Sequence, residues 1–381
     1  MPDPIGIKRY SIPELRALLA SWGEPTFRAT QLLRWLYADG ASSYQDMSNL
    51  SKSLRRRLEE DEPLYLPEIV DRQVSADRAR KYVLRLADGL CVETVGIPDR
   101  ERLTVCFSTQ VGCSMGCLFC TTGSGGLSRS LYAGEMVDQL TIVSGDMGLR
   151  VTNAVAMGEG EPFANYDATL AALRIMNSPD GPGIGARHLT VSTCGLIKQV
   201  DRFAQEPEQF TLAVSLHSAV QSTRDMLMPA LANQPLDALR QSLVRYTEKT
   251  GRRLSFEVVL IDTVNDTPHE IAAMLEFAQG LLCHINLIPL NRMIEACPDA
   301  AAPLDETDKR SPALRSAPYA HGVMRRPVSR ATRGFELVPS SYERVSEIAA
   351  AIQRTGLECS IRRSRGLDIQ GACGQLKGMR S

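Results

Sequence analysis

The sequence contains no long apolar run. No stretch of its 381 residues approaches the roughly 18 consecutive apolar residues of a membrane-spanning helix. The opening segment MPDPIGIKRYSIPE also lacks the apolar core of a secretory signal peptide. We therefore expect a cytoplasmic protein that has no membrane partner.

The sequence also lacks an excess of charge of either sign. Its 43 Lys and Arg residues balance 44 Asp and Glu residues, which gives a net charge of −1 and a pI of about 6.6. A protein that binds nucleic acid over its whole surface is usually basic, so any RNA binding must depend on local basic patches. The composition, 44% apolar and 23% charged, excludes wholesale disorder.

A disulfide framework is not expected either. The ten cysteines are unevenly spaced, and a reducing compartment would keep them as thiols. Three of them, Cys113, Cys117 and Cys120, lie close together in the sequence. Four of the others are expected to be buried as small apolar side chains, namely Cys91, Cys194, Cys283 and Cys359.

The first part of the chain, residues 1–63, is predicted to be a small helical domain. Ser11 and Glu14 have the spacing of a capping box at the start of one helix. A later helix carries the arginine run 55–57, which is either an RNA-binding face or an ordinary solvated face.

Residues 99–366 are predicted to form the main α/β domain. Apolar strand candidates alternate with helical stretches at spacings typical of βα units with a parallel sheet. Six such units fall short of a closed eight-stranded barrel. We therefore expect an open, partial (βα)6 barrel with its active site at the carboxyl ends of the strands. The expected strands are 103–108, 152–157, 188–193, 210–216, 254–261 and 284–289.

Three further segments complete the expected domain organisation. Residues 64–98 alternate in short apolar segments around an Asp88-Gly89 turn, which predicts a linking β-hairpin. Residues 292–338, inside the main domain, are rich in Ala, Pro, Ser and Arg and predict an inserted loop. Residues 367–381 form a tail in which glycines flank Cys373.

The spacing Cys113-x-x-x-Cys117-x-x-Cys120 follows the first expected strand. Three thiolates cannot complete a tetrahedral zinc site, and no second close cysteine pair follows in the sequence. Three cysteines can instead hold a 4Fe–4S cluster with one open iron. That iron can chelate S-adenosylmethionine and pass an electron into its sulfonium bond. The spacing therefore favours such a cluster over zinc or plain core thiols.

Polar residues also stand at the ends of the later strands. The turn 158–162 (GEGEP) would let a ligand approach the backbone, and its carboxylates could accept hydrogen bonds from an ammonium group. Ser192, the run 215–217 and Asn291 occupy corresponding strand ends. Each alone is typical of a strand-end cap, but together they indicate one shared ligand.

These motifs resemble a known family. The segments CFSTQVGCSMGCLFC, GEP, VSLH, RDMLMP, INLIPLN and ACGQL, in this order, are similar to those of the radical-SAM RNA adenine methyltransferases of the RlmN/Cfr group. The similarity extends from about residue 11 to residue 377 and is interrupted by 292–338. It implies a helical N-terminal domain, a partial (βα)6 barrel, and methylation of an adenine ring carbon by means of two S-adenosylmethionine molecules.

The resemblance also implies roles for single residues. Cys373 matches the cysteine that is first methylated and then carries the methylene group to RNA. Cys106 matches the thiol that resolves the adduct by forming a disulfide with Cys373, and Glu93 matches the proton acceptor. The implied ligands of the single 4Fe–4S cluster are Cys113, Cys117 and Cys120. The implied S-adenosylmethionine contacts are Gly160, Glu161, Ser192, Ser215, Leu216, His217 and Asn291.

The same resemblance implies the partners of a monomeric enzyme. Carbon 2 of an adenine in 23S rRNA is the expected target, tRNA next to the anticodon is a second candidate substrate, and flavodoxin or ferredoxin would donate electrons. Arg362, Arg363 and Arg365, just before the tail, are expected to hold RNA phosphates. Four arginines of the insert, Arg325, Arg326, Arg330 and Arg333, either extend this surface or belong to a solvated loop.

Three alternatives stay open at this level. A relative within the family would methylate carbon 8 of adenine. Another radical-SAM enzyme would activate a protein or modify a small molecule. A zinc-containing RNA-binding module would have no catalytic activity. Independently of these three alternatives, Glu93 is either the proton acceptor or an ordinary exposed hairpin residue.

Overall fold

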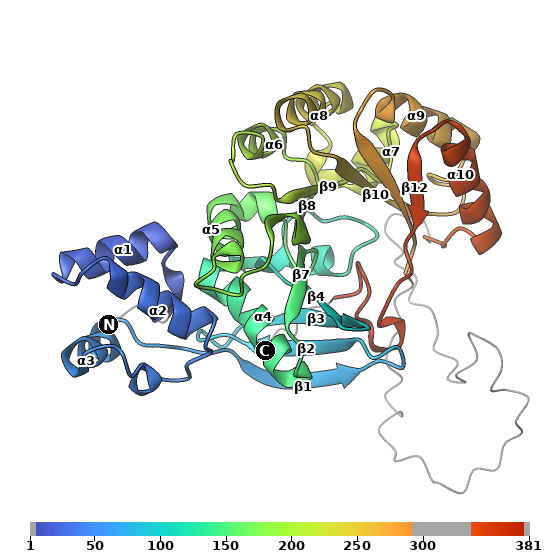
Figure 1. Ribbon diagram of the computed structural model, residues 1–381. Coiled ribbons are helices and arrows are strands. Elements are labelled where there is room, and N and C mark those ends of the chain that lie inside the picture. Colours follow the sequence, from blue (N-terminus) through green and yellow to red (C-terminus); the bar gives the residue numbers. More distant parts are fainter. Residues whose placement is uncertain (1–4, 292–336, 377–381) are drawn as a thin grey trace, which may run out of the picture.

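The computed structural model describes residues 5–291 and 337–376 (Figure 1). Its N-terminal part contains three helices, α1 (Ile12–Ser21), α2 (Phe27–Tyr37) and α3 (Lys52–Asp61). The capping box at the start of α1 is confirmed. The Ser11 side chain accepts a hydrogen bond from Glu14 N, and the Glu14 carboxylate accepts one from Ser11 N.

A ten-stranded open sheet forms the rest of the framework, in the order β1-β2-β3-β4-β7-β8-β9-β10-β11-β12. The strands β1 (Glu68–Val74), β2 (Arg80–Arg85), β3 (Cys91–Asp99) and β4 (Arg102–Cys106) pair in antiparallel fashion. From β4 onward the neighbours are parallel. These later strands are β7 (Val151–Ala156), β8 (Leu189–Thr193), β9 (Thr211–Ser215), β10 (Leu254–Leu260), β11 (Cys283–Pro289) and β12 (Glu358–Ile361). A separate antiparallel pair consists of β5 (Gln110–Cys113) and β6 (Gly126–Ser130).

The six predicted strands of the partial barrel are confirmed, as β4 and β7 to β11. The predicted hairpin is present as β2 and β3, but β1 adds a third strand to it. The sequence did not indicate β1 because polar residues occupy both faces of EIVDRQV, so the apolar alternation is weak. Since β3 also pairs with β4, these strands continue the barrel sheet.

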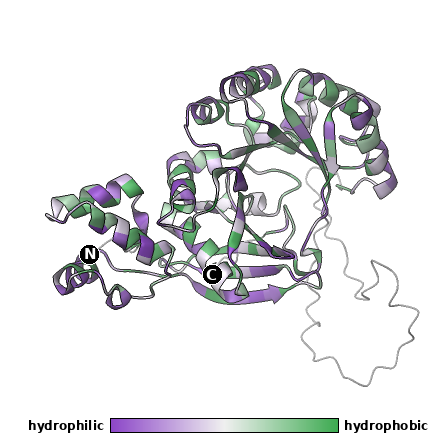
Figure 2. Cartoon of the chain, in the orientation of Figure 1, coloured by the Kyte–Doolittle hydropathy of each residue, from purple (hydrophilic) through white to green (hydrophobic). Residues whose placement is uncertain are grey.

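Helices connect and cover the parallel strands (Figure 1). Apolar residues concentrate along the strands and on the helix sides turned toward them (Figure 2). Phe256 of β10, for example, is fully buried, and its ring centroid lies 5.7 Å from that of Phe277. The helices are α4 (Ala133–Met147), α5 (Tyr166–Asn177), α6 (Ile197–Phe203), α7 (Gln221–Leu227), α8 (Leu236–Thr250), α9 (Pro268–Ala278) and α10 (Tyr342–Arg354).

Two predictions from composition bear on the rest of the chain. Within residues 5–291 and 337–376, no helix is both long and apolar enough to cross a membrane. The predicted insert, with its four arginines, falls outside the described residues except at its last two positions.

A buried ion pair joins the N-terminal segment to the barrel. Lys8 Nζ lies 2.5 Å from Asp138 Oδ1 on α4, and the two side chains are only 2% and 4% exposed. Lys8 Nζ also lies 4.4 Å from the centroid of the Tyr37 ring on α2. Burial raises the pKa of Asp138, and the attraction of Lys8 opposes this effect. Removing either partner would leave the other charge buried without compensation.

We expect Lys8→Met to lower the free energy of unfolding by about 3–5 kcal/mol, because it leaves the Asp138 carboxylate buried and unpaired. The double variant Lys8→Met/Asp138→Leu should recover most of this loss. Urea denaturation would measure the free energy of unfolding of the single and the double variant. Arg57→Met is the matched control, because it removes an exposed partner of Asp61 that should contribute less than about 1 kcal/mol. Equal losses in the Lys8 and Arg57 variants would contradict the expectation.

Candidate active site

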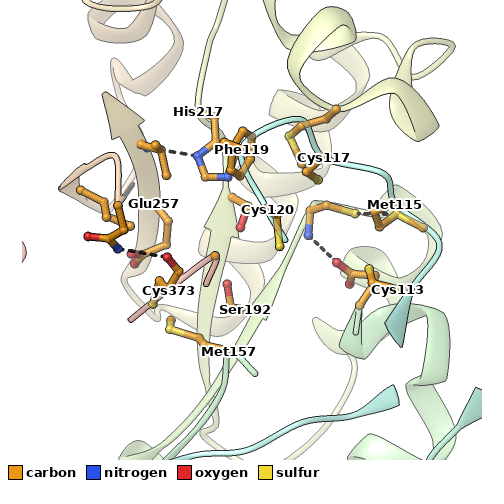
Figure 3. Close-up of a pocket in the computed structure, with 18 of the residues that line it drawn as sticks. Cys113, Met115, Cys117, Phe119, Cys120, Met157, Ser192, His217, Glu257 and Cys373 are labelled. Atoms are coloured by element: carbon orange, nitrogen blue, oxygen red, sulfur yellow. Dashed lines mark hydrogen bonds between the residues drawn. The ribbon is translucent and has the colours of Figure 1, made fainter. Parts of the chain in front are cut away.

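One cavity opens at the carboxyl ends of the parallel strands (Figure 3). Its volume is about 900 Å³, including the solvent space at its mouth. Loops after β5, β7, β8, β9 and β11 contribute to its wall, as expected for a parallel sheet. The predicted site residues that line it are Cys113, Cys117, Cys120, Gly160, Glu161, Ser192, Ser215, His217, Asn291 and Cys373.

The three closely spaced cysteines lie on one side of this cavity. Cys113 ends β5, and Cys117 and Cys120 follow in the next loop. Burial raises the pKa of Cys113 to about 11 and also raises that of Cys117, and neighbouring thiols add to both shifts. These thiols would therefore stay protonated without a nearby cation, whereas iron would bind them as thiolates.

The three thiols are a donor set that a 4Fe–4S cluster can use. Within residues 5–291 and 337–376, no three His, Cys, Asp or Glu side chains surround one point as they would around a single metal ion. In a 4Fe–4S cluster each cysteine binds a different iron, so three thiols in one wall are an appropriate set. Cys113, Cys117 and Cys120 are the residues that would hold such a cluster.

The turn after β7 holds two buried carboxylates. Glu161 accepts hydrogen bonds from Phe163 N at 2.9 Å, Thr193 Oγ1 at 2.6 Å and Cys194 N at 2.8 Å. These contacts join the turn to the loop after β8, and burial raises the pKa of Glu161. Gly160 precedes Glu161 in this turn and needs to be glycine. Its φ is +102°, and a Cβ at this position would lie 2.6 Å from Gln110 Cβ.

The second carboxylate, Glu159, lies behind the cavity wall. It accepts hydrogen bonds from Glu93 N at 2.7 Å and from Gly112 N at 3.2 Å, so it connects β3 with β5. Burial raises the pKa of Glu159 to about 7, and the nearby Glu93 charge adds to the shift. The sequence did not single out this bracing role, since GEGEP gave no sign of which carboxylate faces the cavity.

His217 and its neighbours form the wall after β9. The His217 backbone has a φ of +57°, and its Nδ1 accepts a hydrogen bond from Val259 N at 3.1 Å. Its ring lies edge-on to Phe119, with centroids 4.4 Å apart. Burial lowers the pKa of His217 to about 3, so the imidazole is neutral at physiological pH. The side chain of Leu216 is fully buried and does not line the cavity, and its predicted contact with S-adenosylmethionine stays a prediction.

A buried arginine holds this wall in place. Arg224 is 1% exposed and donates hydrogen bonds to the carbonyl oxygens of Ser215 at 2.9 Å and Cys194 at 2.7 Å, and also to that of Leu216. It therefore links the loops after β8 and β9. The motif RDMLMP contains this residue, but the sequence alone did not indicate its role.

The Cys373 segment forms another side of the cavity. Asn291 Nδ2 donates to the Cys373 carbonyl oxygen at 3.0 Å, and Thr121 N donates to that of Gly374 at 2.8 Å. Thr122 Oγ1 donates to the Leu376 carbonyl oxygen at 2.8 Å. The tail is thus held by the loop that carries the three cysteines, although more than 250 residues separate them in the sequence.

Cys106, at the end of β4, lies next to the cavity but is not part of its wall. It is 7% exposed and packs with Val95 and Leu376. Burial raises the pKa of Cys106 to about 12, the Cys373 thiol adds to this, and Arg362 opposes it. All the described cysteines are free thiols, so the disulfide implied between Cys106 and Cys373 is not present in this structure.

Glu93 is not an exposed hairpin residue. It is 4% exposed on β3, and its Oε1 lies 3.1 Å from Lys81 Nζ on β2. Its backbone is also held, since its carbonyl oxygen accepts from Ser108 Oγ at 2.5 Å. Glu93 does not line the cavity, but Val95, two residues further along the same strand, packs against Cys106.

The arginines before the tail do not share one role. Arg363 and Arg365 are exposed and remain available to phosphates. Arg362 lines the cavity instead, with Nη1 3.5 Å from Glu257 Oε2, so the prediction of an RNA-phosphate contact is not supported at this position. The sequence did not single out Glu257 and assigned Arg362 to phosphate binding, because β10 and β12 meet β11 from opposite sides only in the folded sheet.

Comparisons with known proteins identify the family of the chain. The family model described as the ribosomal RNA large subunit methyltransferase N-terminal domain matches residues 6–62, and that of the radical SAM superfamily matches residues 107–278. A probable dual-specificity RNA methyltransferase RlmN from Alkaliphilus metalliredigens is 36% identical over 376 residues, which covers 98% of this chain and 96% of the relative. The chain belongs to the RlmN family.

Further RlmN relatives support this assignment. One from Thermosynechococcus vestitus is 39% identical over 367 residues, with 96% of each chain covered. The crystal structure of a radical SAM methyltransferase from Sphaerobacter thermophilus has a TM-score of 0.82 and 38% identity, covering 98% of this chain and 99% of that one. The chain is therefore an S-adenosylmethionine-dependent radical methyltransferase. The family implies a 4Fe–4S cluster and S-adenosylmethionine.

The raised pKa of Glu159 predicts how one buried carboxylate contributes to stability as pH changes. The folded state holds a proton on Glu159 up to about pH 7, whereas an unfolded glutamate releases it near its usual value of 4.5. The contribution of this group to stability is therefore fully present below pH 4.5 and is lost as pH rises toward 7.

We expect Glu159→Gln to gain stability relative to the unsubstituted protein as pH rises through this window. The gain should be up to roughly 3 kcal/mol in the free energy of unfolding, because each pKa unit corresponds to about 1.4 kcal/mol. Urea denaturation at pH 4.5 and 7.5 would measure it. Glu101→Gln, at an exposed site, should show no such trend. A difference that is independent of pH would rule out this role of Glu159.

Proposed function

We propose that this protein methylates carbon 2 of an adenine in 23S rRNA, with tRNA next to the anticodon as a second substrate. The observation that carries this proposal is that Cys373 lines the same cavity as Cys113, Cys117 and Cys120. A methyl group on Cys373 would then lie close to a radical generated at that cavity. The relatives are named dual-specificity RNA methyltransferases, which supports RNA as the substrate class.

Cys373 is the proposed nucleophile of the first step. Carbon 2 of adenine is electron-poor and does not attack a methyl sulfonium, whereas a thiolate does. Cys113, Cys117 and Cys120 would hold a single cluster, which would supply the electron for cleaving a second S-adenosylmethionine molecule, and the methyl group on Cys373 would give up a hydrogen atom to the radical so formed. The hydrogen bonds from Asn291 and Thr121 to the tail hold the Cys373 sulfur inside the cavity for both events.

Release of the product needs a base and a second thiol. Glu93 is the proposed acceptor of the adenine ring proton, and its Oε1 lies 3.1 Å from Lys81 Nζ in a buried site. Cys106 would attack the Cys373 sulfur, form a transient disulfide and free the methylated base.

RNA contact is proposed for exposed basic residues on two elements. Arg363 and Arg365 stand beside the Cys373 tail, and Arg56 and Arg57 are exposed on α3 of the N-terminal helices. Positive side chains at both places would hold phosphates on either side of the target adenine. Flavodoxin or ferredoxin is the proposed electron donor, and the proposed catalytic unit is a monomer in the cytoplasm.

The mass of the tryptic peptide 366–377 tests the proposed function directly. In protein expressed with its cluster, we expect a gain of one methylene unit on Cys373. The same peptide from Cys117→Ala protein, in which the cluster is not held, is the reference for an unmodified thiol. Cys373 found unmodified in protein that holds its full cluster would contradict the proposed mechanism.

Two cysteine variants separate the later steps. Cys106→Ala should accumulate a covalent protein–RNA adduct that is visible on a denaturing gel, because the bond between Cys373 and the base cannot be resolved. Cys359→Ala, at another buried cysteine, should turn over normally. Turnover by Cys373→Ala, or absence of the adduct in Cys106→Ala, would contradict these roles. Digestion of the RNA product and comparison with methyladenine standards would distinguish carbon 2 from carbon 8.

The cluster ligands can be tested without RNA. Cys117→Ala, purified and reconstituted under anaerobic conditions, should bind less than about a tenth of the iron and sulfide of the unsubstituted protein, because one iron loses its anchor. Cys194→Ala is the matched control, since Cys194 lines the same cavity but is not an expected ligand. Full iron and sulfide in the Cys117 variant, or a zinc-loaded protein, would contradict the assignment.

A further inference from the structure

Arg362 occupies an unusual position for a residue in an arginine-rich segment. It follows β12 directly, and its backbone N donates to the Leu287 carbonyl oxygen at 2.8 Å, which continues the pairing with β11. Its side chain lines the cavity and is only a quarter exposed. The next residue, Arg363, is exposed. The guanidinium of Arg362 therefore belongs to the reaction cavity and not to the outer surface.

Glu257 holds this guanidinium from β10, which lies on the other side of β11. Glu257 Oε2 lies 3.5 Å from Arg362 Nη1, and the carboxylate is itself fixed. Ser255 Oγ donates to Glu257 Oε1 at 2.9 Å, and Asn286 Nδ2 donates to Glu257 Oε2 at 2.8 Å. Because two side chains hold the Glu257 carboxylate, the carboxylate gives the Arg362 guanidinium a defined position. An ion pair at the surface would not fix the guanidinium in this way.

The thiols of the proposed reaction are the other titratable groups near Arg362. Cys373 lines the same cavity, and Figure 3 shows it on the Glu257 side, together with Met157. Arg362 Nη1 contacts Met157 Sδ at 3.5 Å, and the Met157 backbone hydrogen-bonds the Cys106 sulfur. Cys373, Glu257 and Cys106 are the groups that raise the pKa of Arg362, and Cys373 contributes most.

We propose that Arg362 is a positioning residue for sulfur chemistry, whose guanidinium stabilises the thiolate of Cys373 for methylation and that of Cys106 for resolution. This inference rests on the proposed function and adds a residue to it. A guanidinium keeps its charge at any physiological pH and carries five N–H donors, so the contacts with Glu257 and Met157 use only part of its capacity.

Both sulfur steps need an anion at a buried position. In the first step the Cys373 thiolate attacks the methyl carbon of S-adenosylmethionine, the new S–C bond forms, and S-adenosylhomocysteine leaves with the electron pair of the broken sulfonium bond. In the last step the Cys106 thiolate attacks the Cys373 sulfur, and the S–S bond forms. The S–C bond to the base breaks, and its electron pair takes up a proton to give the methyl group.

The last step needs no external oxidant, because the Cys106 thiol and the Cys373 thioether sulfur are oxidised to a disulfide while the methylene group is reduced to methyl. It does require a buried thiol to lose its proton. Burial raises the pKa of Cys106 to about 12, the Cys373 thiol adds to this shift, and Arg362 and the hydrogen bond from the Met157 backbone oppose it. The Arg362 guanidinium could stabilise the Cys373 thiolate in the first step and the Cys106 thiolate in the last step, since only one of the two sulfurs is a thiolate at each step.

Closure of the Cys106–Cys373 disulfide by diamide, in RNA-free protein, tests this inference independently of methylation. Diamide is the oxidant, it accepts the two hydrogen atoms of the thiols, and mass spectrometry of the linked peptides follows the bond. We expect Arg362→Met to close the bond about tenfold more slowly at pH 7.5, which corresponds to one pKa unit of thiolate stabilisation. The pH–rate profile of the Arg362→Met variant should move to higher pH by about one unit.

Two variants separate an electrostatic role from a structural one. Arg362→Lys keeps the charge and should close the bond within about threefold of the unsubstituted rate. Arg363→Met makes the same chemical change at the neighbouring exposed position and should have no effect. An Arg362→Met rate and pH profile equal to those of Arg363→Met would overturn the proposal. Equal slowing in Arg362→Met and Arg362→Lys would also overturn it, because only the packing would then matter.

Methylation of Cys373 is measured in parallel to keep the two hypotheses distinguishable. If peptide 366–377 is methylated in the unsubstituted protein but Arg362→Met has no effect on disulfide closure, the proposed function stands and the role of Arg362 fails. If the peptide is never methylated but the closure rate depends on the charge at position 362, the proposed function fails while Arg362 still stabilises the thiolates.

Discussion

The parallel pairing of β4 and β7 to β12 is the constraint on which the rest of the structure depends. Parallel strands in one sheet end at the same edge, so residues that follow different strands meet there regardless of their separation in the sequence. The glycine-rich turn after β7, Ser192 at the end of β8 and Asn291 after β11 reach one cavity for this reason. The helices remove the apolar faces of the strands from water, and the polar groups that line the cavity gather at this edge.

The cavity is completed by a segment that lies outside the repeating βα units. The tail passes along the loop of the three cysteines, and hydrogen bonds from Thr121 and Thr122 hold it there. Gly374 permits this approach, since its φ is +79° and a Cβ would lie 3.2 Å from the Phe119 carbonyl oxygen. The tail that carries Cys373 and the loop that carries the three cysteines therefore stabilise each other. A substitution in one segment should alter the position of the other.

Buried charges around the cavity are each compensated by specific contacts. Glu161 accepts three hydrogen bonds, Arg224 donates to three carbonyl oxygens, and Glu257 faces Arg362. Because an uncompensated charge in such a site is costly, these groups determine the relative positions of the loops they join. The same low-dielectric surroundings raise the thiol pKa values, which is why a cation beside the sulfurs matters for chemistry that proceeds through thiolates.

The sequence by itself determined the class of fold and the chemistry of the cysteine loop. Periodic apolar segments predicted the six strands, because burial against helices imposes that pattern, and the spacing of Cys113, Cys117 and Cys120 predicted a three-thiol site, because those residues share one loop. Only the tertiary structure decided that Glu93 is buried against Lys81, that Arg362 faces the cavity and Arg363 the solvent, and that Cys106 lies near Cys373. These three placements depend on which strands become neighbours and on which face of its strand each residue lies. Contacts between distant parts of the chain determine the order of the strands and the face that each residue occupies.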